Sequence, residues 1–176
     1  MQRVAIIGST GSGKSTLAAA LSAKLGLLHT ELDTLHWLPD WQERDDGTFR
    51  RLVDDATAKT GWVIDGGYSI VRDLVWGRAD TIIWLDYSFT RTAWQLLRRT
   101  ALRNARGDPC CNGNRESLWR SLGTDSILLW LLKTYWTNRR RFPSALAQYG
   151  VGREVIRLRS PRDTRRWLAS RTATAR

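Results

Sequence analysis

The stretch Val4-Ala5-Ile6-Ile7-Gly8-Ser9-Thr10-Gly11-Ser12-Gly13-Lys14-Ser15 decides the fold of this chain of 176 residues. Its apolar half predicts a β-strand, its second half has the spacing GxxxxGK[ST], and residues 16–25 predict a helix. Glycines at these positions let the backbone curl around a phosphate chain, and Lys14 reaches the β and γ phosphates while the Ser15 hydroxyl ligates Mg²⁺. The positive end of the following helix faces the same anion. We therefore expect ATP and Mg²⁺ to bind at Gly8, Ser9, Thr10, Gly11, Ser12, Gly13, Lys14, Ser15 and Thr16. The alternative, a glycine-rich turn that binds nothing, requires Lys14-Ser15 at this spacing by accident.

Length and composition favour one domain over residues 1–176, with 42% apolar residues, as in a globular α/β protein. The first expected strand begins within three residues of the N-terminus, which leaves no room for a signal peptide. The longest apolar run, residues 127–132, is far shorter than the roughly 20 residues that span a bilayer. The sequence therefore predicts a soluble, cytoplasmic protein without a membrane partner.

The net charge of +11 is unevenly distributed. Residues 1–90 contain 9 Lys and Arg against 12 Asp and Glu, whereas residues 91–176 contain 19 against 5. Arginine suits bidentate binding of phosphate, although a solvated basic face explains most of these residues equally well.

Short apolar runs alternate with longer amphipathic ones along the whole chain, which is typical of βαβ units and a parallel sheet. Strands are predicted at 3–7, 27–30, 62–65, 81–86 and 154–158. Helices are predicted at 15–25, from a Thr48 N-cap to 59, from a Ser88 N-cap to 103, at 125–148 and after Ser160-Pro161. Residues 31–47 and 105–123 are expected to be irregular.

Carboxylates stand at the ends of the expected strands, where ligands bind in open α/β sheets. Asp65 follows an apolar strand and is placed to hold Mg²⁺ through water, together with Ser15. Asp33 is a second candidate, and for both residues a strand-end cap is the competing interpretation. Asp86 could hold Mg²⁺ in the same way, but a strand-end cap is favoured for it. Tyr87 follows it in place of the Glu that polarises water in motor-type ATPases, which argues against that class of enzyme.

The order of Gly8–Ser15, Asp33, Asp65-Gly66-Gly67-Tyr68 and the Arg-rich excursion resembles that in P-loop kinases of nucleoside monophosphates and small metabolites. The phrases Trp62-Val63-Ile64-Asp65-Gly66-Gly67-Tyr68 and Gly113-Asn114-Arg115-Glu116 are most similar to the adenylate-kinase-related, FlaR-like "DNA topology modulation" kinases. The resemblance implies a P-loop NTPase α/β/α fold in three layers, with a five-stranded parallel sheet in the order 2-3-1-4-5. It also implies an acceptor-binding segment at about 31–60 and a short lid at about 104–124.

The same resemblance implies roles for individual residues. Asp33 matches the carboxylate that contacts the acceptor or its proton. Asp65-Gly66-Gly67 matches the DG motif of nucleotide kinases but lacks the following Pro-Arg, which weakens the case for binding an acceptor phosphate there. Since phosphoryl transfer needs positioning and positive charge more than covalent help, the expected catalytic residues are Lys14, Asp33, Arg103, Arg115 and Arg139.

Two hypotheses follow from the sequence, and an ATPase without an acceptor, which would turn over ATP in water alone, is a third possibility. The first is a kinase that transfers the γ-phosphate of ATP to a small acceptor, including a nucleoside monophosphate. The second is an ATP-dependent nucleic-acid-binding or regulatory protein, which the basic second half favours although no known DNA- or RNA-binding motif is visible. The acceptor and the oligomeric state stay open.

Overall fold

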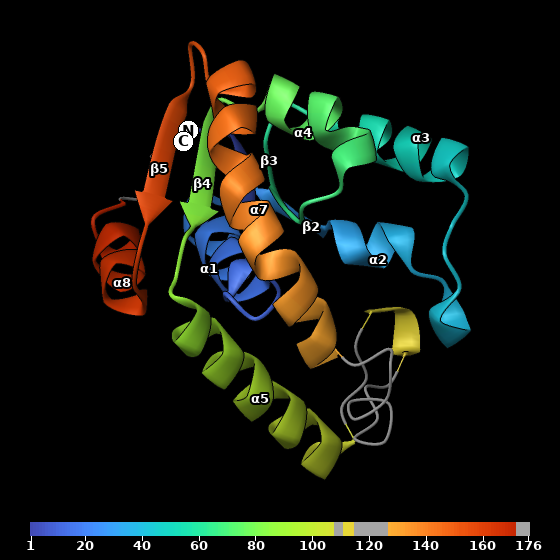
Figure 1. The fold of residues 1–176 in the computed structure, drawn as a ribbon. Coiled ribbons are helices and arrows are strands. Elements are labelled where there is room, and N and C mark those ends of the chain that lie inside the picture. Colours follow the sequence, from blue (N-terminus) through green and yellow to red (C-terminus); the bar gives the residue numbers. More distant parts are fainter. Residues whose placement is uncertain (108–110, 115–126, 172–176) are drawn as a thin grey trace.

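The computed structural model describes residues 1–107, 111–114 and 127–171. Five strands form one all-parallel sheet in the order β2-β3-β1-β4-β5 (Figure 1). The strands are β1 (Arg3–Gly8), β2 (Leu28–Glu31), β3 (Trp62–Asp65), β4 (Thr81–Leu85) and β5 (Glu154–Leu158). This topology confirms the expected fold class and order. It brings the carboxyl ends of β1, β2, β3 and β4 to one edge, where Ile6 lies opposite Asp65 and Gly8 opposite Leu85.

Helices cover both faces of the sheet, so the molecule has three layers (Figure 1). The longer helices are α1 (Lys14–Leu25), α3 (Asp46–Thr57), α5 (Phe89–Arg106), α7 (Ile127–Tyr149) and α8 (Pro161–Ala169). The shorter elements are α2 (Leu32–His36), η1 (Pro39–Trp41), η2 (Ser69–Val71), α4 (Arg72–Arg78) and η3 (Cys111–Gly113). Within the described ranges, none of the helices is long and apolar enough to cross a membrane.

The central strand β1 contributes side chains to two separate hydrophobic cores, because its side chains alternate between the two faces of the sheet. Ala5 and Ile7 pack into a core with α3, α4 and α7, whereas Val4 and Ile6 pack into a core with α1. All four side chains are almost fully buried. Burial on both faces explains why β1 is a continuous apolar run and not an alternating one.

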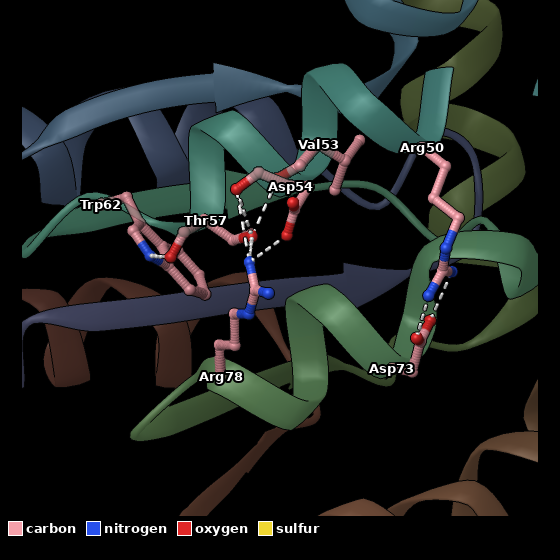
Figure 2. Close-up of polar contacts among 7 residues, drawn as sticks. All are labelled: Arg50, Val53, Asp54, Thr57, Trp62, Asp73 and Arg78. Carbon is pink, nitrogen blue, oxygen red and sulfur yellow. Dashed lines mark hydrogen bonds and ion pairs between the residues drawn. The ribbon is translucent and has the colours of Figure 1, made fainter. Parts of the chain in front are cut away.

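Polar contacts join α3 to α4 at the edge of the first core (Figure 2). Arg78 Nη1 lies 2.6 Å from Asp54 Oδ1 and donates to the Thr57 hydroxyl over 2.7 Å. At the other end of α4, Arg50 forms a bidentate pair with Asp73. These contacts hold α3 and α4 together, and Thr57 O also accepts from Trp62 Nε1 at the start of β3.

The segment between β2 and β3 is more regular than the sequence indicates. Residues 31–47, expected to be irregular, contain α2 and η1. The prediction of Thr48 as N-cap of α3 is wrong: the Asp45 carboxylate caps the helix by accepting from Thr48 N over 2.8 Å. Aspartate and threonine both cap helices, so composition alone does not separate positions three residues apart. The predicted caps Ser88 and Ser160 are confirmed.

Candidate functional site

The backbone conformation of the loop between β1 and α1 depends on its glycines. Gly11 and Gly13 have φ of +82° and +89°, where L side chains are strained. Gly11 also lies against α5, since a Cβ on it would come within 2.8 Å of Leu96 Cβ and 2.9 Å of Thr92 O. Gly13 is the N-cap of α1, and no side chain of the described residues caps that helix. The first amides of α1 are therefore left to bind an anion.

Lys14 bends back over the loop. Its Nζ donates to Ser9 O over 3.0 Å. Burial lowers the pKa of the Lys14 ammonium, while the carboxylates of Asp33 and Asp65 act in the opposite direction and Arg99 adds to the lowering. The charges of both candidate carboxylates, Asp33 and Asp65, therefore act on Lys14.

Ser15 and Asp65, the expected metal pair, meet at the ends of β1 and β3. Ser15 Oγ donates to Asp65 Oδ2 over 2.7 Å, and the carboxylate is buried. The other oxygen, Oδ1, lies 2.7 Å from His29 Nε2, and this hydrogen bond raises the pKa of His29. Both oxygens of Asp65 are therefore oriented.

Two residues that were not among the predicted site residues, His29 and Glu31, lie in the same cluster. Ligand atoms of His29, Glu31 and Asp65 all lie within 4.8 Å of one another. Burial raises the pKa of Glu31, the Asp65 charge adds to this, and the Arg103 charge opposes it. The available signal is register: β2 pairs in parallel with β3, so Glu31 stands directly beside Asp65.

These residues fit a magnesium-bound triphosphate. The hydroxyl and carboxylate oxygens of Ser15, Asp65 and Glu31 are hard donors of the kind that Mg²⁺ prefers. Ser12 Oγ is buried in the loop and has no hydrogen-bond partner among the described residues. A buried hydroxyl without a partner costs free energy that a bound phosphate oxygen would recover.

On the other side of Lys14, Asp33 lies exposed on the first turn of α2. The Tyr68 hydroxyl donates to Asp33 Oδ1 over 2.8 Å. Burial, and then the Asp33 charge, raise the pKa of Tyr68 well above its usual value, so this hydroxyl keeps its proton. His36 stands behind Tyr68 with ring centroids 4.5 Å apart, and Trp37 and Trp41 lie edge to face at 5.7 Å.

The start of the expected lid contacts this acceptor segment. Asn112 Nδ2 donates to Thr34 O over 2.8 Å, and Asn114 Nδ2 donates to Leu38 O over 2.9 Å. Asn114 Oδ1 accepts from Trp41 N over 3.0 Å. Two segments more than 70 residues apart in sequence are thereby joined beside Asp33.

The three expected phosphate-binding arginines have different surroundings. Arg103 lies near enough to Glu31 for its charge to affect that carboxyl, on the same side of α5 as Arg99. Arg139 Nε lies 3.1 Å from Asp86 Oδ1, and Arg157 binds the other oxygen of the same buried carboxylate. Asp86 thus joins β4, β5 and α7, which the interpretation as a cap did not include. Arg115 lies outside the described residues.

Three solved structures with a similar fold are described as kinases. A gluconokinase from Sinorhizobium meliloti 1021 is 18% identical, with a TM-score of 0.53 over 96% of this chain and 91% of its own. A sugar kinase from Janibacter sp. HTCC2649 is 17% identical, with a TM-score of 0.52 over 96% and 93%. Shikimate kinase from Acinetobacter baumannii, in complex with shikimate, is 13% identical, with a TM-score of 0.57 over 96% and 89%. The chain therefore has the α/β fold of P-loop kinases.

Sequence comparison adds little to this result. No family model matches the chain. The chain is 30% identical over 86 residues to the uncharacterized protein YqaC of Bacillus subtilis (strain 168), and the match spans 48% of each protein. The chain thus aligns with about half the length of this curated relative.

Proposed function

We propose that the protein is an ATP-dependent phosphotransferase that transfers the γ-phosphate of ATP to a small acceptor bound at Asp33. The observation that carries this proposal is the contact between Ser15 and Asp65, 50 residues apart, at the mouth of the phosphate loop. A loop that served only as a turn would not need a buried carboxylate held against the hydroxyl that follows its lysine.

The donor side follows from the loop. Backbone amides of residues 8–16 would bind the phosphates, and Lys14 would bind the β and γ oxygens in place of its contact with Ser9 O. Ser15 and Asp65 would hold Mg²⁺, with Glu31 beside them. When bound, this ion would neutralise negative charge on the phosphates as the phosphoryl group is transferred.

The acceptor side follows from Asp33. In the proposed reaction an acceptor hydroxyl oxygen forms a bond to the γ-phosphorus, the bond from that phosphorus to the β,γ-bridging oxygen breaks, and ADP leaves. The hydroxyl proton passes to Asp33, which Tyr68 orients. Arg99 and Arg103 on α5, with Arg115 and Arg139 as further candidates, would stabilise the phosphoryl group in transit.

A hydroxyl-bearing metabolite is the acceptor class that we propose first. An exposed carboxylate suits a hydroxyl better than a phosphate, and the Asp65-Gly66-Gly67 motif lacks the Pro-Arg expected for an acceptor phosphate. The three similar structures bear the names of sugar, gluconate and shikimate kinases. A nucleoside monophosphate is the second candidate, since Trp37 and Trp41 beside Asp33 offer aromatic surface for a base and the sequence resembles adenylate-kinase-related, FlaR-like kinases.

An acceptor screen tests the proposal. ADP formation would be measured with ATP and Mg²⁺ in the presence of sugars and sugar acids, nucleosides, or nucleoside monophosphates. We expect one class to raise ADP formation well above the rate in water, and Asp33→Asn to remove that increase. Equal turnover with and without every acceptor would instead indicate an ATPase. Turnover that only nucleic acid stimulates would support the regulatory hypothesis.

A further inference from the structure

Helix α5 exposes several large apolar residues. Trp94 and Leu97 are 53% and 50% exposed, whereas Thr92 and Thr100 are buried on the side that faces the phosphate loop and α7. Helices at the surface of a globular protein ordinarily place apolar residues inward and polar residues outward. The outward face of α5 therefore has the composition of a surface that contacts something else.

Helix α7 extends the same surface. It runs back along α5 in the opposite direction (Figure 1), and the two helices are joined by a seam of Leu96, Leu131 and Tyr135. The ring of Phe89 on α5 stacks on Trp136 at 6.3 Å. In an antiparallel pair of helices, residues one position after or two positions before a seam residue lie on the same side of both helices. The shared side carries Trp94, Leu97, Leu129, Leu132 and Trp136, which are all exposed and which we call the outer α5–α7 face.

Positive charge borders the outer α5–α7 face. Arg91 and Arg98 lie on either side of Trp94, each 5.6 Å from its ring centroid, and Lys133 and Arg140 are exposed on α7. Neither helix contains an Asp or Glu: α5 has five arginines, and α7 has one lysine and three arginines. The face is thus apolar in its centre, and the charged side chains that the two described helices place around it are all basic.

We propose that the outer α5–α7 face docks onto the surface of an anionic phospholipid bilayer. Tryptophan and leucine partition into the boundary between headgroups and acyl chains, and arginine and lysine beside them bind anionic headgroups. The contact would be interfacial, which differs from the sequence-based expectation of no membrane partner, since that expectation considered spanning segments alone. The proposal does not depend on the proposed kinase activity.

Charge and side-chain type favour a bilayer over other partners. A second copy of this chain would bring two cationic faces without acidic residues into contact, and the like charges would repel. A nucleic acid would be attracted by the arginines and stack on the tryptophans, but it would leave Leu97, Leu129 and Leu132 without an apolar partner. The acyl region of a bilayer covers all three leucines.

Sedimentation with vesicles tests this surface. The full chain would be mixed with vesicles of phosphatidylcholine alone or with one third phosphatidylglycerol. We expect at least tenfold stronger binding to the anionic vesicles and at least tenfold weaker binding of a Trp94→Ser, Leu97→Ser, Trp136→Ser variant. A matched control, Leu28→Ser with Val151→Ser, removes exposed apolar residues elsewhere and should bind as the parent does. A second variant, Arg91→Gln with Arg98→Gln, leaves the apolar contacts in place and should also lose binding.

Several results would overturn the proposal. These are equal binding to both vesicle types, unchanged binding of the Arg91→Gln, Arg98→Gln variant, or equal loss in the matched control. A dimer in sedimentation equilibrium that the serine variant converts to monomer would assign the face to a second copy. Binding to a single-stranded oligonucleotide that the serine variant loses, with no binding to either vesicle type, would assign it to nucleic acid.

Discussion

Substitution of Gly11 by alanine tests how the phosphate loop is packed against α5. At φ +82° an alanine is strained by about 1–2 kcal/mol. Its Cβ would also stand 2.8 Å from Leu96 Cβ and 2.9 Å from a backbone oxygen of the same helix. Overpacking of this kind costs about 1–3 kcal/mol, because the loop or α5 must move. We expect Gly11→Ala to lower the free energy of unfolding by about 2–5 kcal/mol.

Gly13→Ala is the matched control. Gly13 has nearly the same φ, +89°, but a Cβ there meets nothing within 4 Å. Only the backbone strain of about 1–2 kcal/mol applies. In a chain of this size each kcal/mol shifts the melting temperature by about 2–4 °C. Thermal unfolding of the ligand-free proteins, followed by circular dichroism, should therefore show the larger decrease for Gly11→Ala. Equal decreases in the two variants would refute the close approach of the loop to α5.

Three further substitutions test the proposed metal site and two ion pairs that stabilise the fold. Asp65→Asn keeps hydrogen-bonding atoms beside the loop but removes the charge. The value of kcat should therefore fall by about 10–100-fold, and half-maximal activity should need a higher Mg²⁺ concentration. An unchanged Mg²⁺ dependence would contradict the role of Asp65 in holding the metal ion. Asp86→Ala should lower the free energy of unfolding, measured in urea, by about 1–3 kcal/mol, which is less than for a fully buried pair because both arginine partners are 40% exposed. Asp54→Ala removes a partner from an exposed ion pair and should lower the same free energy by less than about 1 kcal/mol. A larger loss for Asp54→Ala than for Asp86→Ala would be inconsistent with the structure. The Arg50 guanidinium holds the pKa of Asp73 below its usual value. The stability that this pair adds is therefore fully present at pH values above the usual pKa of an aspartate. It is lost as the pH falls through the pKa that Asp73 has in the folded protein. Asp73→Asn should accordingly be less stable than the parent at pH 7 and equal to it at pH 2, and a difference that persists at pH 2 would be contrary to this account.

The sequence predicts the sheet and the phosphate loop well, because both depend on local signals. Each strand is a run of apolar residues that must be buried on two faces, and the spacing of Gly8, Lys14 and Ser15 specifies its loop without help from the rest of the chain. The contact of Ser15 with Asp65 could also be predicted, since parallel strands place their carboxyl ends together.

Residues whose positions depend on partners distant in sequence could not be predicted in this way. Glu31 and His29 join the cluster only through the register of β2 against β3. Arg139 is one of eighteen arginines after residue 90, and nothing in its neighbourhood indicates the buried Asp86 that it meets. Short helices such as α2 have too few residues to show a period, so the sequence predicts a loop there.

The measurement that tests the central claim most directly is ADP formation by Lys14→Ala with ATP, Mg²⁺ and the acceptor that the screen identifies. If Lys14 binds the β and γ phosphates, this variant should show no detectable transfer while its circular dichroism spectrum and melting curve stay close to those of the parent. Normal transfer by a folded Lys14→Ala protein would contradict the assignment of the loop as the ATP site.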